Sequence, residues 1–159
     1  MTQAKKPDLE QRKRKILPPV YLLLAFALME LLHHVAPLGR VIEAPYSYLG
    51  AVPLLAGLIM SATAARSFRK AGTPVVPFEP STALVTSGFF RYTRNPMYLG
   101  MVLMLAGVAV LLGSLSPLLV IPVFVWIIQS NFIRGEEQFQ EGIFGEQYLG
   151  YKRRVRRWI

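Results

Sequence analysis

The chain has 159 residues, 53% of them hydrophobic and only 17% charged, with a formal net charge of +9 at pH 7. Soluble domains usually carry about a quarter charged residues, so this composition argues against an ordinary soluble protein. The chain contains no cysteine, which excludes disulfides, thiolate catalysis and cysteine-based metal sites.

Four apolar stretches follow one another along the chain, and each is close to the roughly 20 residues that a helix needs to cross a bilayer. The predicted spans are residues 17–35, 46–65, 96–112 and 115–133. Pro53 should kink the second span, because proline removes a helical hydrogen bond. Gly113 and Ser114 form a tight turn, so residues 96–133 should be an antiparallel helical hairpin. We therefore expect an all-α, polytopic protein with a single membrane domain and four transmembrane helices.

Polar segments flank and separate these spans, and almost all basic residues lie in three of them. Six of the 18 Lys and Arg residues fall in the basic N-terminal segment 1–16, five in the connection 66–96 and six in the segment 134–159, whereas Arg40 lies elsewhere. This alternation is the pattern of the positive-inside rule, so both termini and the connection should be cytoplasmic. Nucleic acid requires one continuous basic surface. The expected partner is therefore the lipid bilayer, and we expect no binding to nucleic acid.

The polar segments differ in their expected structure. The connection 66–96 contains several glycines and prolines and should be mostly irregular. Residues 134–159 should be helical at least in part. No sequence feature indicates the oligomeric state.

The stretch 88–100 leads from this connection directly into the third span. Pro96 fits the first turn of a helix, whose free backbone N–H groups can receive an anionic ligand. Arg94 adds a planar pair of donors suited to a carboxylate. The simpler alternative is that Arg94 anchors the membrane face and that Tyr92 and Tyr98 are interfacial aromatics.

A second polar cluster, Glu136 and Glu137, follows the fourth span. The predicted hairpin brings this pair to the same membrane face as residues 94–98. Carboxylates beside Arg94 would form a site able to hold a zwitterionic ligand. The alternative is a solvated helix start, where acidic residues are favoured by the helix dipole.

Together these clusters resemble the isoprenylcysteine carboxyl methyltransferase and phospholipid methyltransferase superfamily. Its members share an arginine–histidine–proline–x–tyrosine segment before one helix and a paired glutamate after the next, and the resemblance extends through residues 144–148, Tyr151 and residues 155–159. It implies a cytoplasmic S-adenosylmethionine pocket, with Arg94, Asn95, Pro96, Tyr98, Gly100, Glu136 and Glu137 as cofactor-site positions. We also expect Tyr92, Leu99 and Tyr148 to bind the cofactor, Glu137 and Arg94 to be catalytic, and no metal at the site. The membrane setting suits a lipophilic methyl acceptor.

Asn95 departs from this pattern, because it stands where the family most often has histidine. An amide donates and accepts hydrogen bonds but is no base near pH 7. Cofactor binding is compatible with this change, whereas proton transfer by this position is not. A carboxylate or thiolate acceptor would need no base, and an amine acceptor could lose its proton to Glu136 or Glu137.

Two other functions compete with methyl transfer. Glu30 lies within the first span, as in small four-span transporters, and it shares a helix face with His33 and His34. For the histidines we expect headgroup anchoring or interhelical hydrogen bonds rather than metal binding, since the chain has only two. The second alternative is a non-catalytic or reductase-like relative of the same fold, which Asn95 keeps open.

Overall fold

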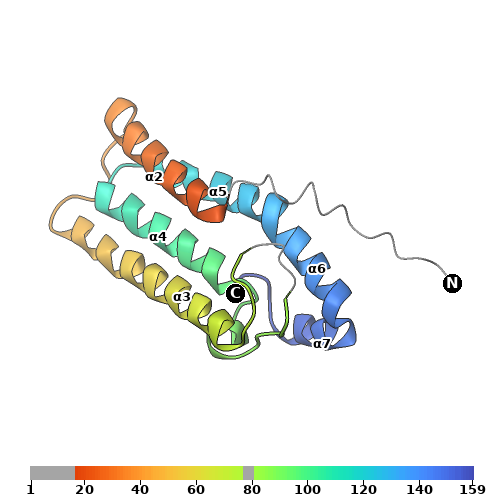
Figure 1. The fold of residues 1–159 in the computed structure, drawn as a ribbon. Helices are drawn as coiled ribbons and strands as arrows, with labels where there is room; N and C mark the ends of the chain where they lie inside the picture. Colours follow the sequence, from red (N-terminus) through yellow and green to blue (C-terminus); the bar gives the residue numbers. More distant parts are fainter. Residues whose placement is uncertain (1–16, 77–80) are drawn as a thin grey trace.

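The computed structural model describes residues 17–76 and 81–159, and these residues fold into helices (Figure 1). The predicted basic segment 1–16 lies outside the described residues. The elements in chain order are α2 (Pro18–Val35), η1 (Tyr46–Gly50), α3 (Ala51–Lys70), η2 (Gly88–Arg91), α4 (Pro96–Leu112), η3 (Ser116–Leu119), α5 (Val120–Ile128), η4 (Gln129–Ile133), α6 (Arg134–Phe144) and α7 (Glu146–Arg154).

Helices α2, α3, α4 and α5 run alternately in opposite directions, and α4 lies in the middle of the bundle (Figure 1). The predicted hairpin of the third and fourth spans is therefore confirmed. The main core lies between α2, α4 and α5, where Met29, Leu105 and Ile128 are completely buried. On the other side, α4 packs along α3, its most extensive partner.

Glycines allow the backbones of α3 and α4 to approach each other closely. Gly50, directly before α3, faces Gly107 of α4. Further along the two helices, Gly57 of α3 faces Gly100 of α4. A Cβ atom placed on Gly107 would lie 2.6 Å from the carbonyl oxygen of Gly50. Small residues at helix contacts are a common means of association in membranes. Gly107 and Gly100 thus serve the packing of these helices.

Three helical segments are long and apolar enough to cross a membrane: Pro18–Val35, Tyr46–Lys70 and Ser116–Phe144. The remaining predicted span, Pro96–Leu112, is a shorter apolar helix of 17 residues. This length is at the lower limit for a spanning helix. The fold is thus that of an all-helical membrane protein in its described residues, and four complete spans remain a prediction.

The helices that contain two of the predicted spans extend beyond the predicted bounds. After residue 133 the helix continues through a π-helical turn (η4) and α6 to Phe144, in line with the helix expected within residues 134–159. Charged residues replace apolar ones there, but no proline interrupts the helix. The second span continues to Lys70 rather than residue 65. Pro53 lies in the first turn of α3, directly after the 3₁₀ helix η1, where a missing N–H breaks no helical hydrogen bond.

The connection between α2 and α3 closes the end of the bundle where α4 turns into η3. The backbone N–H groups of Val41 and Ile42 donate to the carbonyl oxygen of Gly113, at 2.8 and 3.1 Å. His33 Nδ1 lies 2.8 Å from Ser114 Oγ, so the predicted tie between elements is confirmed for this histidine.

Glu30 and His34 pair with each other within α2, at 2.8 Å, on its exposed surface. The Glu30 side chain is 58% exposed. Among the described residues, no group of three or more His, Cys, Asp or Glu side chains is placed to hold a metal ion.

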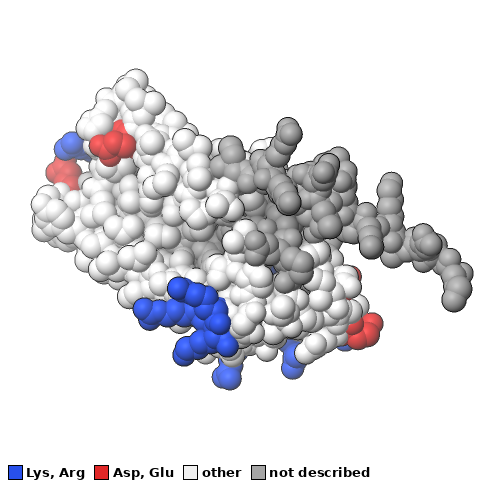
Figure 2. Space-filling model, viewed as in Figure 1, with Lys and Arg blue, Asp and Glu red and all other residues white. Residues whose placement is uncertain are grey.

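Charge differs between the two ends of the molecule. In Figure 2, basic side chains gather where α3 ends, whereas the opposite end, near the connection of α2 to η1, shows acidic and basic groups together. The residues Arg66, Arg69 and Lys70 lie in the last turns of α3. The basic end is also the end at which α4 begins and α7 lies (Figure 1).

Candidate functional site

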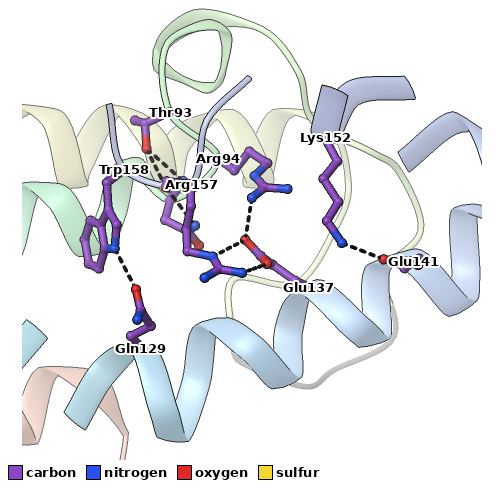
Figure 3. Close-up of polar contacts among 9 residues, drawn as sticks. Thr93, Arg94, Gln129, Glu137, Glu141, Lys152, Arg157 and Trp158 are labelled. Carbon is purple, nitrogen blue, oxygen red and sulfur yellow. Dashed lines mark hydrogen bonds and ion pairs between the residues drawn. The ribbon is translucent and has the colours of Figure 1, made fainter. Parts of the chain in front are cut away.

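A polar cluster lies at this basic end, where residues 93–98, α6 and the segment 155–159 meet (Figure 3). Asn95 precedes α4 and Pro96 is its first residue, so the chain enters the helix with a proline where no N–H is needed. Arg94 therefore lies just outside the helix, directed toward α6. Its Nη2 atom is 3.1 Å from Glu137 Oε1. The predicted meeting of the two polar clusters is confirmed by this contact.

Glu137 is held by two arginines. Arg157 binds it through two parallel contacts, Nε to Oε1 at 3.0 Å and Nη2 to Oε2 at 2.7 Å. The Arg94 and Glu137 side chains are only 8% and 7% exposed, so a buried carboxylate is neutralised between two guanidinium groups. The hydrogen bond with Glu137 also raises the pKa of Arg157, which keeps that group cationic.

The segment 155–159 is fixed to the start of α4 by its backbone. The carbonyl oxygen of Arg156 accepts from the backbone N–H of Arg94 at 3.0 Å. The carbonyl oxygen of Arg157 accepts from Thr93 Oγ1 and from Asn95 Nδ2, both at 3.1 Å. The Trp158 indole N–H donates to Gln129 Oε1 at 2.9 Å, which ties the same segment to η4 (Figure 3).

A cavity opens beside this network. Seven of the predicted site residues line it: Arg94, Asn95, Pro96, Tyr98, Glu136, Glu137 and Tyr148. Three predicted residues lie elsewhere. Tyr92 is 75% exposed, Leu99 is absent from the lining, and Gly100 faces Gly57 and Ser61 of α3. A role in cofactor binding for these three stays a prediction that their positions do not support.

Two residues that line this cavity, Arg94 and Gln140, carry polar atoms that are only partly satisfied. Within the described residues, the buried atoms Arg94 Nε, Arg94 Nη1 and Gln140 Oε1 have no hydrogen-bond partner. Unpaired buried polar groups are costly, so such atoms in a cavity indicate a ligand that pairs with them. Two guanidinium donors suit a carboxylate, and an amide oxygen suits an ammonium group. The amino-acid part of S-adenosylmethionine carries both groups, so the residues present fit this cofactor.

Tyr98 and Glu136 form a second polar pair in the cavity. The Tyr98 hydroxyl donates to Glu136 Oε1 at 2.7 Å. Tyr98 is 5% exposed, so the ring is fixed by packing and directs its hydroxyl at the carboxylate. The pair adjoins the arginine network, because Glu136 and Glu137 are consecutive in α6.

Helix α7 closes the cavity on one side. Gly145 adopts a positive φ of 51° between α6 and α7, a conformation that favours glycine and lets α7 fold back. Tyr148 and Tyr151 thereby become buried, and the Tyr151 hydroxyl donates to the Phe90 carbonyl at 2.7 Å. Burial raises the pKa of Tyr148 to about 12 and also raises the pKa of Tyr151, so both hydroxyls stay protonated at neutral pH.

Sequence reasoning missed two important members of the site. Gln140 is one helical turn after Glu136, so the i, i+4 spacing could have placed both on one face. Arg157 lies in the segment 155–159, which the family resemblance includes. No spacing rule pairs it with Glu137, because the rest of α6, a turn and α7 lie between them. The other residues that line the cavity without having been predicted are Phe68, Leu84, Val85, Phe90, Met97 and Tyr151.

The sequence is similar to a known family and to several known proteins. The phospholipid methyltransferase family model matches residues 46–147, more than half of the chain. The chain belongs to this family. The match includes the cavity residues of α4 and α6, but it ends before the segment 155–159.

Curated relatives of this phospholipid methyltransferase family member include protein-S-isoprenylcysteine O-methyltransferases. The protein from Schizosaccharomyces pombe is 33% identical over 72 residues, covering 45% of this chain and 30% of its own length. Protein-S-isoprenylcysteine O-methyltransferase A from Arabidopsis thaliana is 30% identical over 111 residues, which cover 69% of this chain and 56% of that protein. The chain thus spans about half or less of these relatives.

A solved structure has the same fold. The eukaryotic intramembrane Ras methyltransferase, isoprenylcysteine carboxyl methyltransferase, aligns with a TM-score of 0.62 and 22% identity. The alignment covers 89% of this chain and 51% of that one. This likeness concerns the fold.

Proposed function

We propose that this protein transfers a methyl group from S-adenosylmethionine to a lipophilic acceptor at the cytoplasmic face of the membrane. The observation that carries the proposal concerns Arg94, which lines a cavity of a phospholipid methyltransferase family member. Among the residues that the structure describes, its buried Nε and Nη1 atoms have no hydrogen-bond partner. The other cavity residues supply the matching groups for a zwitterionic cofactor.

In this proposal, Arg94 binds the carboxylate of the cofactor and Gln140 Oε1 accepts from its ammonium group. Glu137 holds Arg94 in place. Because both carboxylate oxygens of Glu137 already accept from arginines, this residue is poorly placed to take a proton from a substrate. That task, where the acceptor is an amine, falls to Glu136 beside Tyr98.

S-adenosylmethionine supplies an electrophilic methyl group on a sulfonium centre. The protein's contribution is mainly to position donor and acceptor, since such a displacement requires close approach in line. The polar network fixes one wall of the cavity, and Phe68, Leu84 and Phe90 provide apolar surface on the others. This combination suits a polar cofactor and a lipophilic acceptor that meet in one cavity.

The proposed orientation follows from charge. The end that carries the cavity also carries Arg66, Arg69 and Lys70 at the end of α3 and Lys152, Arg153 and Arg154 in the last turn of α7. Basic residues favour the cytoplasmic side of a membrane. The cofactor would therefore enter from the cytoplasm, and the acceptor from the bilayer.

Two measurements test the proposal. Isothermal titration calorimetry of the purified protein should show binding of S-adenosylhomocysteine, the expected product. Membranes containing the protein, incubated with a radiolabelled methyl donor, should yield a labelled lipid-soluble product, and excess adenosylhomocysteine should suppress the labelling. If S-adenosylhomocysteine does not bind and no labelled product forms, the methyltransferase proposal is wrong.

Replacement of Tyr98 by phenylalanine should slow methyl transfer about tenfold while changing the affinity for adenosylhomocysteine less than twofold. The change removes the hydroxyl that donates to Glu136 and leaves the Arg94 network intact. Loss of one hydrogen bond to a charged group corresponds to about 1.5 kcal/mol. Initial rates of labelling at saturating donor, compared with calorimetric affinity, separate these effects. A change in affinity without a change in rate would place Tyr98 in cofactor binding instead.

A further inference from the structure

Asn95 has a defined partner in the structure, which bears on its substitution for the family's histidine. Its side-chain Nδ2 group donates to the carbonyl oxygen of Arg157 at 3.1 Å. The same carbonyl accepts from Thr93 Oγ1, and Thr93 Oγ1 in turn accepts from the Asn95 backbone N–H. Asn95 and Thr93 are buried, at 9% and 2% exposure, so water does not compete strongly for these bonds.

The Arg157 carbonyl belongs to the same residue whose side chain binds Glu137. When the Arg157 backbone is held in place, the start of its side chain is held in place too. The guanidinium at the end of that side chain binds Glu137 through two contacts of 3.0 and 2.7 Å. Glu137 Oε1 also receives Arg94 Nη2 at 3.1 Å. Since Nη2 is used in this way, Nε and Nη1 are the Arg94 donors left for a ligand.

We infer that Asn95 is a positioning residue, which acts as a hydrogen-bond donor that holds the segment 155–159 and, through Arg157 and Glu137, sets the direction of Arg94. The inference rests on the proposed function. It gives position 95 no part in proton transfer. An imidazole N–H can also donate to a carbonyl oxygen, so asparagine and histidine can fill this role alike.

Leucine has nearly the shape of asparagine but no donor, so Asn95→Leu isolates the hydrogen bond. Thr93→Val removes the second donor to this carbonyl, together with the oxygen that accepts from the Asn95 backbone N–H. We expect the affinity for S-adenosylhomocysteine to fall about fivefold in Asn95→Leu and about 50-fold in the double variant, because the Arg157 carbonyl then has neither bond. Asn95→His should recover most of the affinity that Asn95→Leu loses.

A second ligand separates positioning from general damage to the fold. 5′-Methylthioadenosine shares the adenosine and sulfur of adenosylhomocysteine but lacks its carboxylate and ammonium groups. Its affinity, measured by calorimetric displacement, should change less than twofold in every variant, because it has no group for Arg94 to bind. Lys152→Gln, which removes only the exposed pair with Glu141, is the control and should leave both affinities unchanged.

The outcomes are distinct. Equal losses for both ligands, or a thermal midpoint lowered in proportion to the affinity, would show that Asn95 only stabilises the fold and would overturn the inference. Failure of histidine to restore binding would do the same. Failure of the wild-type protein to bind adenosylhomocysteine would instead remove the proposed function, and this inference with it.

Discussion

Replacing Arg94 with glutamine should weaken the binding of S-adenosylhomocysteine about a hundredfold and reduce methyl transfer to background. Among the described residues of the network, Arg94 contacts Glu137, lines the cavity and has buried donors without a hydrogen-bond partner. Truncating one partner of a buried charged pair costs about 2–5 kcal/mol, and a hundredfold loss corresponds to about 2.7 kcal/mol. Isothermal titration calorimetry measures this loss directly.

Arg91→Gln is the matched control for this change. Arg91 has the same side chain, lies three residues earlier at the end of η2 and is exposed. Its replacement should leave the affinity within twofold of the wild type, because an exposed charge contributes little. If the two variants bound adenosylhomocysteine equally well, Arg94 would not be a ligand-binding residue and the carboxylate would have to bind elsewhere.

Replacing Gly100 with alanine should destabilise the protein by about 3 kcal/mol, even though only one methyl group is added. The new Cβ would lie 2.6 Å from the Gly57 carbonyl oxygen and 3.1 Å from the Ser61 backbone nitrogen. These are backbone atoms of α3, so relief requires the two helices to separate. Overpacking of this kind typically costs about 1–3 kcal/mol, and rigid backbone neighbours put Gly100 at the upper end. Unfolding in detergent, followed by circular dichroism, measures the change.

The matched control is Gly142→Ala in α6, where an added Cβ meets nothing within 4 Å. Alanine favours helix over glycine, so this variant should be as stable as the wild type or slightly more stable. The comparison also tests the cofactor role that the family pattern gives to Gly100. A Gly100→Ala protein of normal stability that failed to bind adenosylhomocysteine would return Gly100 to the cofactor site.

The parts of the site that the sequence predicts are those set by local signals. Two apolar stretches with Gly113 and Ser114 between them require a hairpin, and a hairpin necessarily brings Arg94 near Glu136 and Glu137. Helix starts are equally local, since Pro96 marks the beginning of α4. These predictions need no knowledge of tertiary packing.

The parts that the sequence does not predict depend on packing at a distance. The return of Arg157 to Glu137 requires the Gly145 turn, the length of α7 and the burial of Tyr148 and Tyr151 to act together. The face to which Gly100 points depends on how α4 docks on α3. The sequence places the last span at residues 115–133 and expects some helix after it, but it does not predict that one uninterrupted helix joins the two.

That long helix sets the depth at which the proposed reaction takes place. At 1.5 Å per residue, the 20 residue-to-residue steps from Ser116 to Glu136 measure about 30 Å, which equals the thickness of a bilayer's hydrocarbon layer. A helix that starts at one surface of this layer therefore brings Glu136 to the other surface. Lipid headgroups lie at this level. An acceptor with an apolar tail and a reactive polar head could present that head to the cavity without leaving the membrane, and the water-soluble methyl donor would not need to enter the hydrocarbon.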